Sequence, residues 1–540
     1  MILFKNYFRL TSLLPGTIIS ITLLTFSFLL FQTLYTSQNT NIFTAIDTRT
    51  IGLLKFTLYQ AFLSTILSLL VGVLLAWALA HQSYFRGRGL LVALFSSSLV
   101  LPTLIVVFGL IGIFGRNGYL NQATLFLFDT SFGSYLYGLG GILLAHVYLN
   151  ASFASRALLH SFESIPKEKY KLAKSLNFSV WQRFWYVEYP ALKSTLLSIG
   201  STIFLLCFTS FAVVLLLGGS PSYNTLEVAI YEAVKLDFDI AMALKLALIQ
   251  LSISAVLVMF SSGFKINQFN LKTSYTFIVW KESRFLRTLQ WGIIGVFILF
   301  FVLPLVVIVI DGVGADFGRI IKEPLFIKSF MTSISLALIS SILTVGIALL
   351  LSNTRRNFSL STRLGTKPLS KVLDSIVAFS GNLYLAIPSL VLGLGFFLMY
   401  QKSEGSEVLW VTMALLSANV LMSLPFALSV LTPAMHKTAQ RYDKLSFSLG
   451  LSTLQRWLYV EYPYLKSSLG YVFALAFCFS LGDLGIIALF GSDEFSTLPW
   501  YLYQLMGSYR TTDAAGVALV LLVLVLGVFI LIPRVFKERL

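Results

Sequence analysis

The sequence contains few charged residues and almost no cysteine. Only 11% of its 540 residues are Asp, Glu, Lys or Arg, whereas a soluble domain carries about 25%. Most of the chain therefore does not face water. The two cysteines, Cys207 and Cys478, lie in separate apolar runs without an accompanying Cys or His cluster. We therefore expect neither a disulfide framework nor a metal site.

The sequence also lacks a phosphate-binding loop. No Gly-x-x-x-x-Gly-Lys-Ser/Thr segment occurs in it, and this is the motif whose backbone cradles the phosphates of ATP. We therefore expect that this chain does not itself bind ATP through such a loop. We also expect no catalytic residues and no bound cofactor in this chain. If ATP drives its activity, the hydrolysis is expected on a separate ATPase subunit.

Long apolar runs fill most of the chain, and 57% of its residues are hydrophobic. A helix that crosses a membrane needs about 20 such residues, and about twelve runs reach this length. Because the runs are continuous, they predict an all-α polytopic membrane protein and not a barrel. The first run is expected to be an uncleaved span, since it is too long for a signal-peptide core. The expected spans lie near residues 13–34, 52–80, 89–114, 135–158, 194–217, 240–262, 289–311, 328–352, 373–400, 408–432, 468–490 and 514–533.

The formal net charge is +16, which is compatible with nucleic-acid binding or with a membrane topology. Cytoplasmic loops of membrane proteins are rich in Lys and Arg. With a cytoplasmic N-terminus, about 29 of the 39 basic residues fall in inside loops, about 9 in outside loops and one, Lys245, in a span. This bias predicts that both termini are cytoplasmic. No nucleic-acid partner is expected, because no basic patch is interleaved with exposed aromatic residues.

One stretch of the sequence occurs twice. Residues 186–194, Tyr-Val-Glu-Tyr-Pro-Ala-Leu-Lys-Ser, return at 459–467 as Tyr-Val-Glu-Tyr-Pro-Tyr-Leu-Lys-Ser, and the two prolines are 463 − 190 = 273 residues apart. Leu-Pro-Thr at 101–103 similarly resembles Ile-Pro-Ser at 387–389, and both prolines are expected to kink their helices. A repeat at half the chain length indicates two fused, related units. With an even number of spans in each unit, about six, the two repeats are expected to be parallel.

The predicted organisation follows from this repeat. The first half covers residues 1–270 and contains a polar segment at 161–190. A cytoplasmic linker at 271–287 leads to the second half, 288–540, which contains a matching polar segment at 433–463. In the topology set by the basic residues, both polar segments face the cytoplasm.

Each polar segment is expected to form a helix, a turn and a second helix before the chain re-enters the membrane. In the first segment, Tyr170, Ala173 and Leu176 are predicted to share one helix face. Asn177 tolerates the left-handed conformation that ends a helix. A short helix lying across a membrane domain suits the docking of a partner, and the alternative is an amphipathic helix on the membrane surface. Two copies on the same side of the membrane favour docking.

The polar segments resemble the E-A-A-x-x-x-G … L-P loop of type I ABC-importer permeases, which depend on a substrate-binding protein. The resemblance consists of the spacing of Ala173 and Asn177, repeated in Ser446 and Gly450. A proline follows thirteen residues after each pair, since 190 − 177 = 463 − 450 = 13. The resemblance extends over nearly the whole chain, which reads as two fused six-helix permease halves.

Some positions depart from the family pattern. Lys171 and Lys444 stand where the family has Glu, and Asn177 replaces the first Gly, so an ion pair made by that Glu is not carried over. The resemblance implies a bacterial inner-membrane location, two copies of a cytoplasmic ABC ATPase that hold ATP-Mg, and a periplasmic substrate-binding protein. The ATPase-docking residues that it implies are Tyr170, Lys171, Ala173, Asn177, Asp443, Lys444, Ser446 and Gly450. The loop exits are Glu188, Pro190, Glu461 and Pro463.

Permeases with two fused halves include those of thiamine and ferric-iron importers. In length, and in stretches such as 141–147, 482–485 and 498–504, this chain looks most like the thiamine permeases. The resemblance therefore implies transport of thiamine and its phosphates, with ferric iron as the alternative. A secondary transporter with parallel repeats would need coupling ions and paired charges in its spans. A structural membrane protein would leave the repeated cytoplasmic segments unexplained.

Ionisable groups inside membrane spans are costly and mark functional sites. Asp483, between Gly and Leu in the eleventh expected span, is a candidate counter-charge for a cationic thiazolium. It could instead be neutral or pair with the one basic residue placed in a span. His146, Asn150 and Asn419 are the other candidates for a translocation pathway. Their alternative role is hydrogen bonding between helices.

Overall fold

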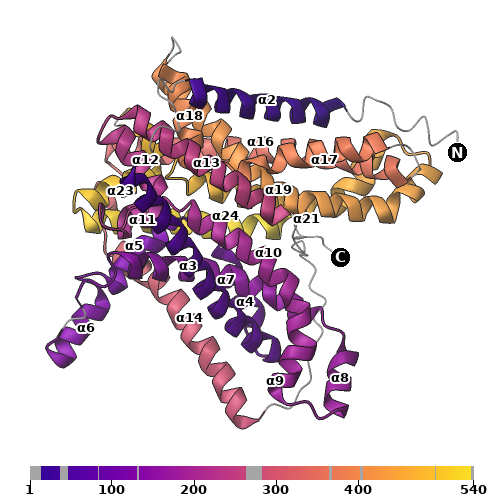
Figure 1. Cartoon of the computed structure of the whole chain (residues 1–540), viewed down its shortest axis with the longest axis horizontal. Coiled ribbons are helices and arrows are strands. Elements are labelled where there is room, and N and C mark those ends of the chain that lie inside the picture. Colours follow the sequence, from indigo (N-terminus) through magenta and orange to yellow (C-terminus); the bar gives the residue numbers. More distant parts are fainter. Residues whose placement is uncertain are drawn as a thin grey trace.

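The computed structural model of the chain is helical, and no strand occurs in the part that it describes (Figure 1). The described residues are 14–36, 47–82, 84–130, 133–262, 283–363, 368–401, 406–492 and 494–536. Both ends of the chain, for which a cytoplasmic location is predicted, lie outside these ranges. Of the predicted linker at 271–287, residues 271–282 lie outside these ranges and residues 283–287 lie within them.

The helices of the first half are α2 (Leu14–Thr36), α3 (Thr48–His81), α4 (Arg88–Ser97), α5 (Thr103–Phe114), α6 (Tyr119–Phe128), α7 (Leu139–Glu163), α8 (Lys167–Ser175), α9 (Val180–Arg183), the π-helix η2 (Phe184–Glu188), α10 (Tyr189–Phe208), α11 (Ala212–Leu217), α12 (Leu226–Lys235) and α13 (Ile240–Ser262). Those of the second half are α14 (Arg284–Val313), α15 (Phe317–Ile320), α16 (Pro324–Arg363), α17 (Pro368–Asn382), the 3-10 helix η3 (Leu383–Leu385), α18 (Ser389–Gln401), α19 (Glu407–Ser448), α20 (Thr453–Arg456), the π-helix η4 (Trp457–Glu461), α21 (Tyr462–Leu481), α22 (Ile487–Phe490), α23 (Leu498–Gly507) and α24 (Thr511–Val535).

The number of membrane spans agrees with the sequence. Among the described residues, 11 helical segments are long and apolar enough to cross a membrane, or up to 12 if one bent pair counts as a span. The prediction of an all-α protein with about twelve spans is therefore confirmed.

Four spans that were expected to be continuous are broken, two in each half. The breaks separate α4 from α5, α10 from α11, α17 from α18, and α21 from α22. The helical segments at 370–385 and 389–401 meet at an angle of 93°. Pro102 and Pro388 directly precede α5 and α18, and a proline lacks the N–H that would continue the preceding helix. The expected kinks at both prolines are therefore confirmed, and each of them coincides with a complete break between two helices.

The first helix of each half packs against the other half. Helix α2 contacts α16, α17 and α18, and α14 contacts α3 and α5. Hydrogen bonds accompany both contacts: Ser20 Oγ donates to Ser380 Oγ over 2.8 Å, and the Tyr148 hydroxyl donates to the Phe301 carbonyl over 2.7 Å. The two halves that the sequence repeat defines are thus interlocked in space.

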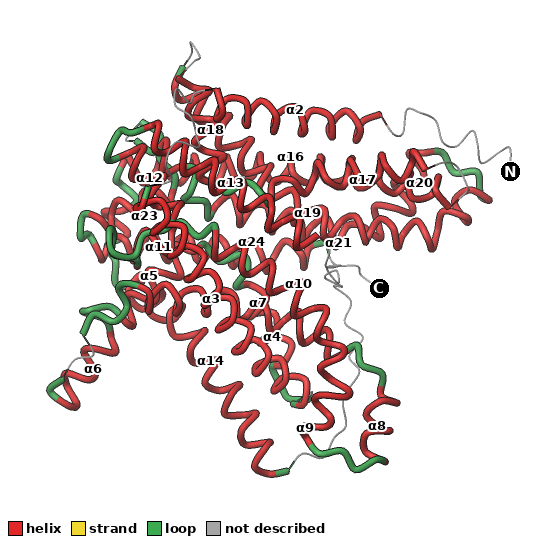
Figure 2. Tube along the Cα trace, in the orientation of Figure 1, coloured by secondary structure: helices red, strands yellow, loops and turns green. Residues whose placement is uncertain are grey.

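Two arms diverge from a shared base (Figure 1). One arm contains α3, α7, α10 and α14, the other contains α16, α17, α19 and α21, and the base contains α5, α11, α12 and α23. Helices α8 and α9 lie at the far end of the first arm, and α20 lies at the far end of the second arm (Figure 2). Both polar segments therefore lie away from the base, as parallel repeats require.

The second polar segment differs from its expected form at its start. A separate helix was expected within residues 433–463, but α19 runs without interruption from Glu407 to Ser448 and includes Pro425 and Pro433. In the first half, by contrast, α7 ends at Glu163 and a turn leads to α8. The second segment is thus a direct extension of its membrane helix.

Candidate functional site

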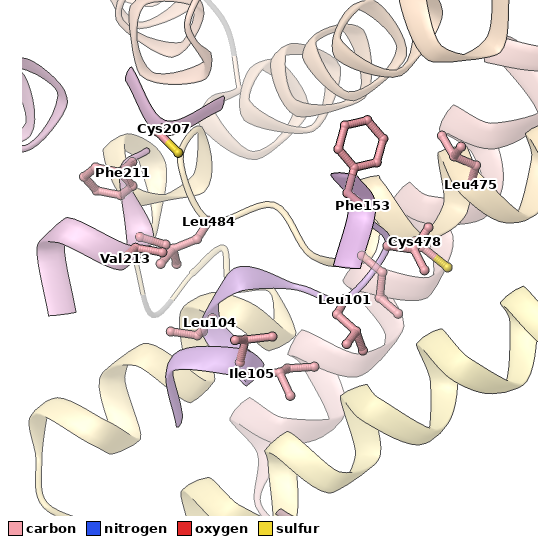
Figure 3. Packing of buried hydrophobic residues seen from close by; sticks show 14 of the residues in the cluster. Leu101, Leu104, Ile105, Phe153, Cys207, Phe211, Val213, Leu475, Cys478 and Leu484 are labelled. Carbon is pink, nitrogen blue, oxygen red and sulfur yellow. The ribbon is translucent and has the colours of Figure 1, made fainter. Parts of the chain in front are cut away.

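A cavity of about 340 Å³ lies where the broken helices of the two halves meet. It is lined by the four residues that the sequence placed on a translocation pathway: Asp483, His146, Asn150 and Asn419. Much of the remaining lining comes from the breaks and from α7 and α19, so both halves contribute. Figure 3 shows Phe211 of the first half and Leu484 of the second half, which both line the cavity, in one cluster of buried side chains.

The lining keeps the symmetry of the sequence repeat. Several residues that face the cavity from the two halves are separated by the same 273 positions as the repeated prolines, since 419 − 146 = 426 − 153 = 483 − 210 = 273. The pairs are His146 with Asn419, Phe153 with Phe426, and Ser210 with Asp483. The two halves therefore present equivalent backbone positions to the cavity but different side chains.

The segment between α21 and α22 approaches two other breaks closely. A Cβ atom on Gly482 would lie 2.9 Å from Pro102 Cγ, and one on Gly485 would lie 2.5 Å from Ser389 Oγ. Both distances are shorter than a normal carbon contact, so this approach favours glycine, which has no Cβ. The Gly-Asp-Leu-Gly sequence thus holds Asp483 against the breaks of both halves.

Three of the candidate pathway residues make hydrogen bonds between helices. His146 Nδ1 lies 2.8 Å from Ser64 Oγ, and its Nε2 lies 2.9 Å from Ser210 Oγ. The amide of Asn150 donates to Cys207 Sγ over 3.3 Å. The amide of Asn419 donates to the hydroxyl of Ser480 over 2.8 Å. These bonds are the alternative role that the sequence left open, and a pathway role for these residues stays a prediction.

Asp483 has different surroundings. Among the described residues that line the cavity it is the only Asp, Glu, Lys or Arg. Its Oδ2 atom is buried and has no hydrogen-bond partner within the described ranges. Lys245, the basic residue that was considered as its partner, lies 4.0 Å from Asp47 Oδ1 instead. The part of the chain that the structure describes contains no group of three His, Cys, Asp or Glu side chains placed to hold a metal ion.

The two polar segments end their first helix in the same way. Asn177 and Gly450 both have a left-handed backbone, with φ of 52° and 61°. In each copy the next residue bonds back to the helix: Phe178 N–H donates to the Ala173 carbonyl over 3.0 Å, and Leu451 N–H donates to the Ser446 carbonyl over 3.1 Å. This is the bonding pattern of a Schellman cap. The expected stop at Asn177 is therefore confirmed.

The second helix of each segment also begins in the same way. Ser179 with Gln182, and Ser452 with Gln455, form reciprocal capping boxes, which satisfy backbone N–H groups at the start of a helix. The chain then passes through η2 or η4 into the next membrane helix, and Pro190 and Pro463 lie in the first turn of α10 and α21. Proline is tolerated there because those N–H groups have no partner within the helix.

The predicted docking residues divide into buried and exposed groups. Tyr170, Ala173 and Ser446 are buried, so they hold their helices against the membrane domain. Burial, together with nearby Glu188, raises the pKa of the Tyr170 hydroxyl. The prediction that Tyr170, Ala173 and Leu176 share a face is wrong, because Leu176 is exposed. Six residues along a helix rotate a side chain about 120° away from the first position. Lys171, Asn177, Lys444 and Gly450 are exposed, and Asp443 is partly buried.

A set of apolar residues that is not among the eight predicted ATPase-docking residues is exposed on both segments. Five positions in the first segment and the five positions 273 residues later are all exposed by 50% to 73%. The pairs are Leu172 with Leu445, Leu176 with Leu449, Trp181 with Leu454, Trp185 with Leu458, and Tyr186 with Tyr459. We call these the first and second apolar docking sets. The sequence signal for these sets is that apolar residues recur 273 positions apart within two otherwise polar segments.

Both loop exits carry a buried carboxylate. Glu188 Oε1 lies 3.1 Å from His81 Nε2 and 3.2 Å from Arg183 Nε. Glu461 Oε1 lies 2.8 Å from Arg456 Nε and also pairs with Arg356. The contacts of Glu188 with His81 on α3, and of Glu461 with Arg356 on α16, tie each loop exit to a membrane helix of its own half.

Comparison with known proteins agrees with this architecture. Residues 68–265 and 357–536 each match the family described as binding-protein-dependent transport system inner membrane component. The thiamine transport system permease protein ThiP of Salmonella typhimurium is 37% identical over 528 residues, which cover 97% of this chain and 96% of that protein. ThiP of Escherichia coli is 36% identical over 89% of this chain and 88% of that protein. ThiP of Haemophilus influenzae is 38% identical over 87% of this chain and 86% of that protein.

Proposed function

Because this chain belongs to the family of binding-protein-dependent transport system inner membrane components, we propose that it is the permease subunit of an ATP-driven thiamine importer. The observation that carries this proposal is the similarity to thiamine permeases, which extends over 97% of the chain. The chain is a multi-pass inner-membrane protein, and its task is transport. The cavity between the two halves is the place where a substrate would cross.

ATP hydrolysis is assigned to separate ATPase subunits, one under each polar segment. The two apolar docking sets support this assignment, because exposed apolar patches on the water-facing part of a protein mark interaction sites. Their five matched pairs place exposed apolar side chains at equivalent positions of both segments, so each segment can receive an ATPase subunit. The segments lie at the ends of different arms. Closure of an ATPase dimer would therefore draw the arms together.

The transport cycle follows from this geometry. When the arms are apart, the space between them opens on the side of the polar segments, which the basic residues place in the cytoplasm. Closure of the arms on ATP would open the base toward the periplasm, where a substrate-binding protein would deliver thiamine. Rigid-body rocking of two repeats around a central site is the usual form of alternating access. The ion pairs at the loop exits would transmit the movement.

Uptake of radiolabelled thiamine tests the function. The permease, its ATPase and the substrate-binding protein are reconstituted in liposomes, with ATP supplied on the side of the ATPase. We expect uptake that requires ATP and the substrate-binding protein, and competition by thiamine phosphates but not by ferric ions. The proposal is overturned if thiamine is not taken up, and ferric uptake under these conditions would identify the alternative importer.

Co-purification tests the docking surfaces. Trp181→Ala and its partner Leu454→Ala remove exposed side chains without disturbing the fold. Because a large apolar anchor in an interface contributes about 1–4 kcal/mol, each change should weaken ATPase binding by about fivefold or more. Leu236→Ala, an exposed position at the end of α12, is the control. Unchanged ATPase binding in both docking variants would exclude these surfaces.

A further inference from the structure

The cavity contains one carboxylate, Asp483, and no Lys or Arg among its described lining residues. Asp483 lies on the non-helical segment between α21 and α22, where Gly482 and Gly485 bring it against both halves. The carboxyl group of Asp483 accepts hydrogen bonds from the backbone of Gly485 and Ile486, but its buried Oδ2 has no hydrogen-bond partner among the described residues. A buried charge without an opposite charge beside it is costly. We propose that this cavity is a binding site for a single heteroaromatic cation, with Asp483 as its counter-charge. The proposal rests on the proposed function and assigns the thiazolium ring of thiamine to this site.

The balance of charge around the cavity defines the class of ligand. No Lys or Arg is among the described residues that line it, so one positive charge on the ligand balances the one carboxylate. The equivalent position in the first half, Ser210, already bonds to His146 over 2.9 Å. The cavity is therefore polarised toward the second half, and a ligand with one cationic ring would bind in one orientation.

Aromatic side chains supply the second feature of the site. Phe153, Phe211, Tyr384, Phe426 and Phe479 all line the cavity. Phe426 and Phe479 pack edge to face, with ring centroids 4.9 Å apart. The faces of such rings attract cations, and flat heterocycles stack on them. The lining thus suits a flat organic cation better than a hydrated metal ion.

The size of the cavity agrees with a small ligand. Its volume of about 340 Å³ lies at the lower end of the roughly 300–1,000 Å³ that small-molecule pockets span. A two-ring molecule of the size of thiamine fits this range. Since the cavity lies at the meeting point of all four helix breaks, any movement of the arms changes its shape, and this couples ligand entry to closure of the arms and ligand release to their separation.

Direct binding tests the site without the substrate-binding protein, which could otherwise set the selectivity. The probes are radiolabelled thiamine and 3-deazathiamine, a neutral analogue with a thiophene in place of the thiazolium. Binding to the purified permease–ATPase complex is measured by equilibrium dialysis. We expect the wild type to bind thiamine at least about tenfold more tightly than the neutral analogue, because only the thiazolium carries a positive charge that Asp483 attracts.

Two variants of Asp483 distinguish an effect of its negative charge on binding from an effect of its shape. Asp483→Asn keeps the shape but removes the charge, so it should lose thiamine affinity by about 10- to 100-fold and lose most of the preference for the cation over the neutral analogue. Asp483→Glu should retain the preference for the cation. A structural role alone would reduce the affinity for both compounds equally. Melting temperature and basal ATP hydrolysis of the complexes check that the variants remain assembled.

The outcomes distinguish the site from the transport function. If the wild type takes up thiamine but its complex shows no preference for the cation, or if Asp483→Asn keeps that preference, the site is overturned and the function stands. If the wild type prefers the cation in dialysis but does not take up thiamine, the cation site stands and thiamine transport fails. If neither compound binds, the site proposal fails.

Discussion

The two loop exits each contain a buried glutamate, but the side chains that surround it differ between the two halves. Glu188 and Glu461 are equivalent in sequence, since 461 − 188 = 273, and both are buried. In the second half, Arg356 pairs with Glu461 and also with Asp443. In the first half, His81 contacts Glu188, and Tyr170 occupies the position equivalent to Asp443, since 443 − 170 = 273.

The two halves share the buried glutamate at the loop exit but not the residues around it. Around its exit carboxylate the first half has His81 and Tyr170, whereas the second half has Arg356 and Asp443. The second cluster therefore contains one more arginine and one more carboxylate than the first. Buried charges are tolerated only when they are paired, and a balanced exchange keeps each cluster viable. The carboxylate at the exit is retained because it fixes the polar segment to its arm.

The largest predicted effect is a loss of stability when the exit carboxylates Glu188 and Glu461 are neutralised. Glu188→Gln removes the carboxylate that both His81 and Arg183 contact, and loss of one partner of a buried ion pair costs about 3–5 kcal/mol. Glu461→Gln should cost less, because Arg356 keeps its contact with Asp443. Thermal unfolding of the detergent-purified protein measures the difference. Glu168→Gln, exposed on α8, is the control. Equal melting temperatures for the two exit variants would contradict this comparison.

A second prediction compares the breaks of α10 and α21. Gly482→Ala places a methyl group 2.9 Å from Pro102 Cγ, and overpacking of this kind costs about 1–3 kcal/mol. Thr209, 273 residues earlier (482 − 209 = 273), already carries a side chain, so Thr209→Ala should change stability by less than about 1 kcal/mol. Melting temperature and thiamine uptake measure both variants. A Gly482→Ala protein with wild-type stability and uptake would mean that the two breaks tolerate the same side chains.

The smallest predicted effect is the change in stability on substitution of the left-handed residues Asn177 and Gly450, which end the first helix of each polar segment. Gly450→Ala puts a Cβ atom on a left-handed residue, which costs about 1–2 kcal/mol. Gly450→Asn should cost less, since Asn177 adopts the same conformation in the first half. Asn177→Gly should be close to neutral. The order of the melting temperatures is the measurement, and a more stable Ala than Asn variant at 450 would show that backbone conformation does not decide this position.

Much of the fold could be predicted from the sequence. About twelve spans, the two parallel units, the helix stop at Asn177 and the kinks at Pro102 and Pro388 depend on apolar length, spacing and the local behaviour of Asn and Pro. These properties act over a few neighbouring residues, so they can be read without knowing what lies opposite. The same reasoning failed for Leu176, because a position six residues after Tyr170 lies about 120° away around the helix and so does not share its buried face.

The candidate site was predicted in part. Asp483, His146, Asn150 and Asn419 were chosen one by one as polar residues in apolar spans, and the structure brings all four to one cavity. Their difference emerged only in space: His146, Asn150 and Asn419 make hydrogen bonds to neighbouring helices, whereas Asp483 Oδ2 has no such partner among the described residues. Sequence spacing carries no information about hydrogen bonds between separate helices.

The sequence by itself determined the membrane class, the internal repeat and the two polar segments, because composition and periodicity are local properties of the chain. Only the tertiary structure decided that α2 and α14 cross to the opposite halves, that all four helix breaks converge, and that the apolar docking sets face outward. These features arise from packing between segments that are far apart in the sequence. The contact surfaces, and therefore the buried and exposed faces, exist only once those segments meet.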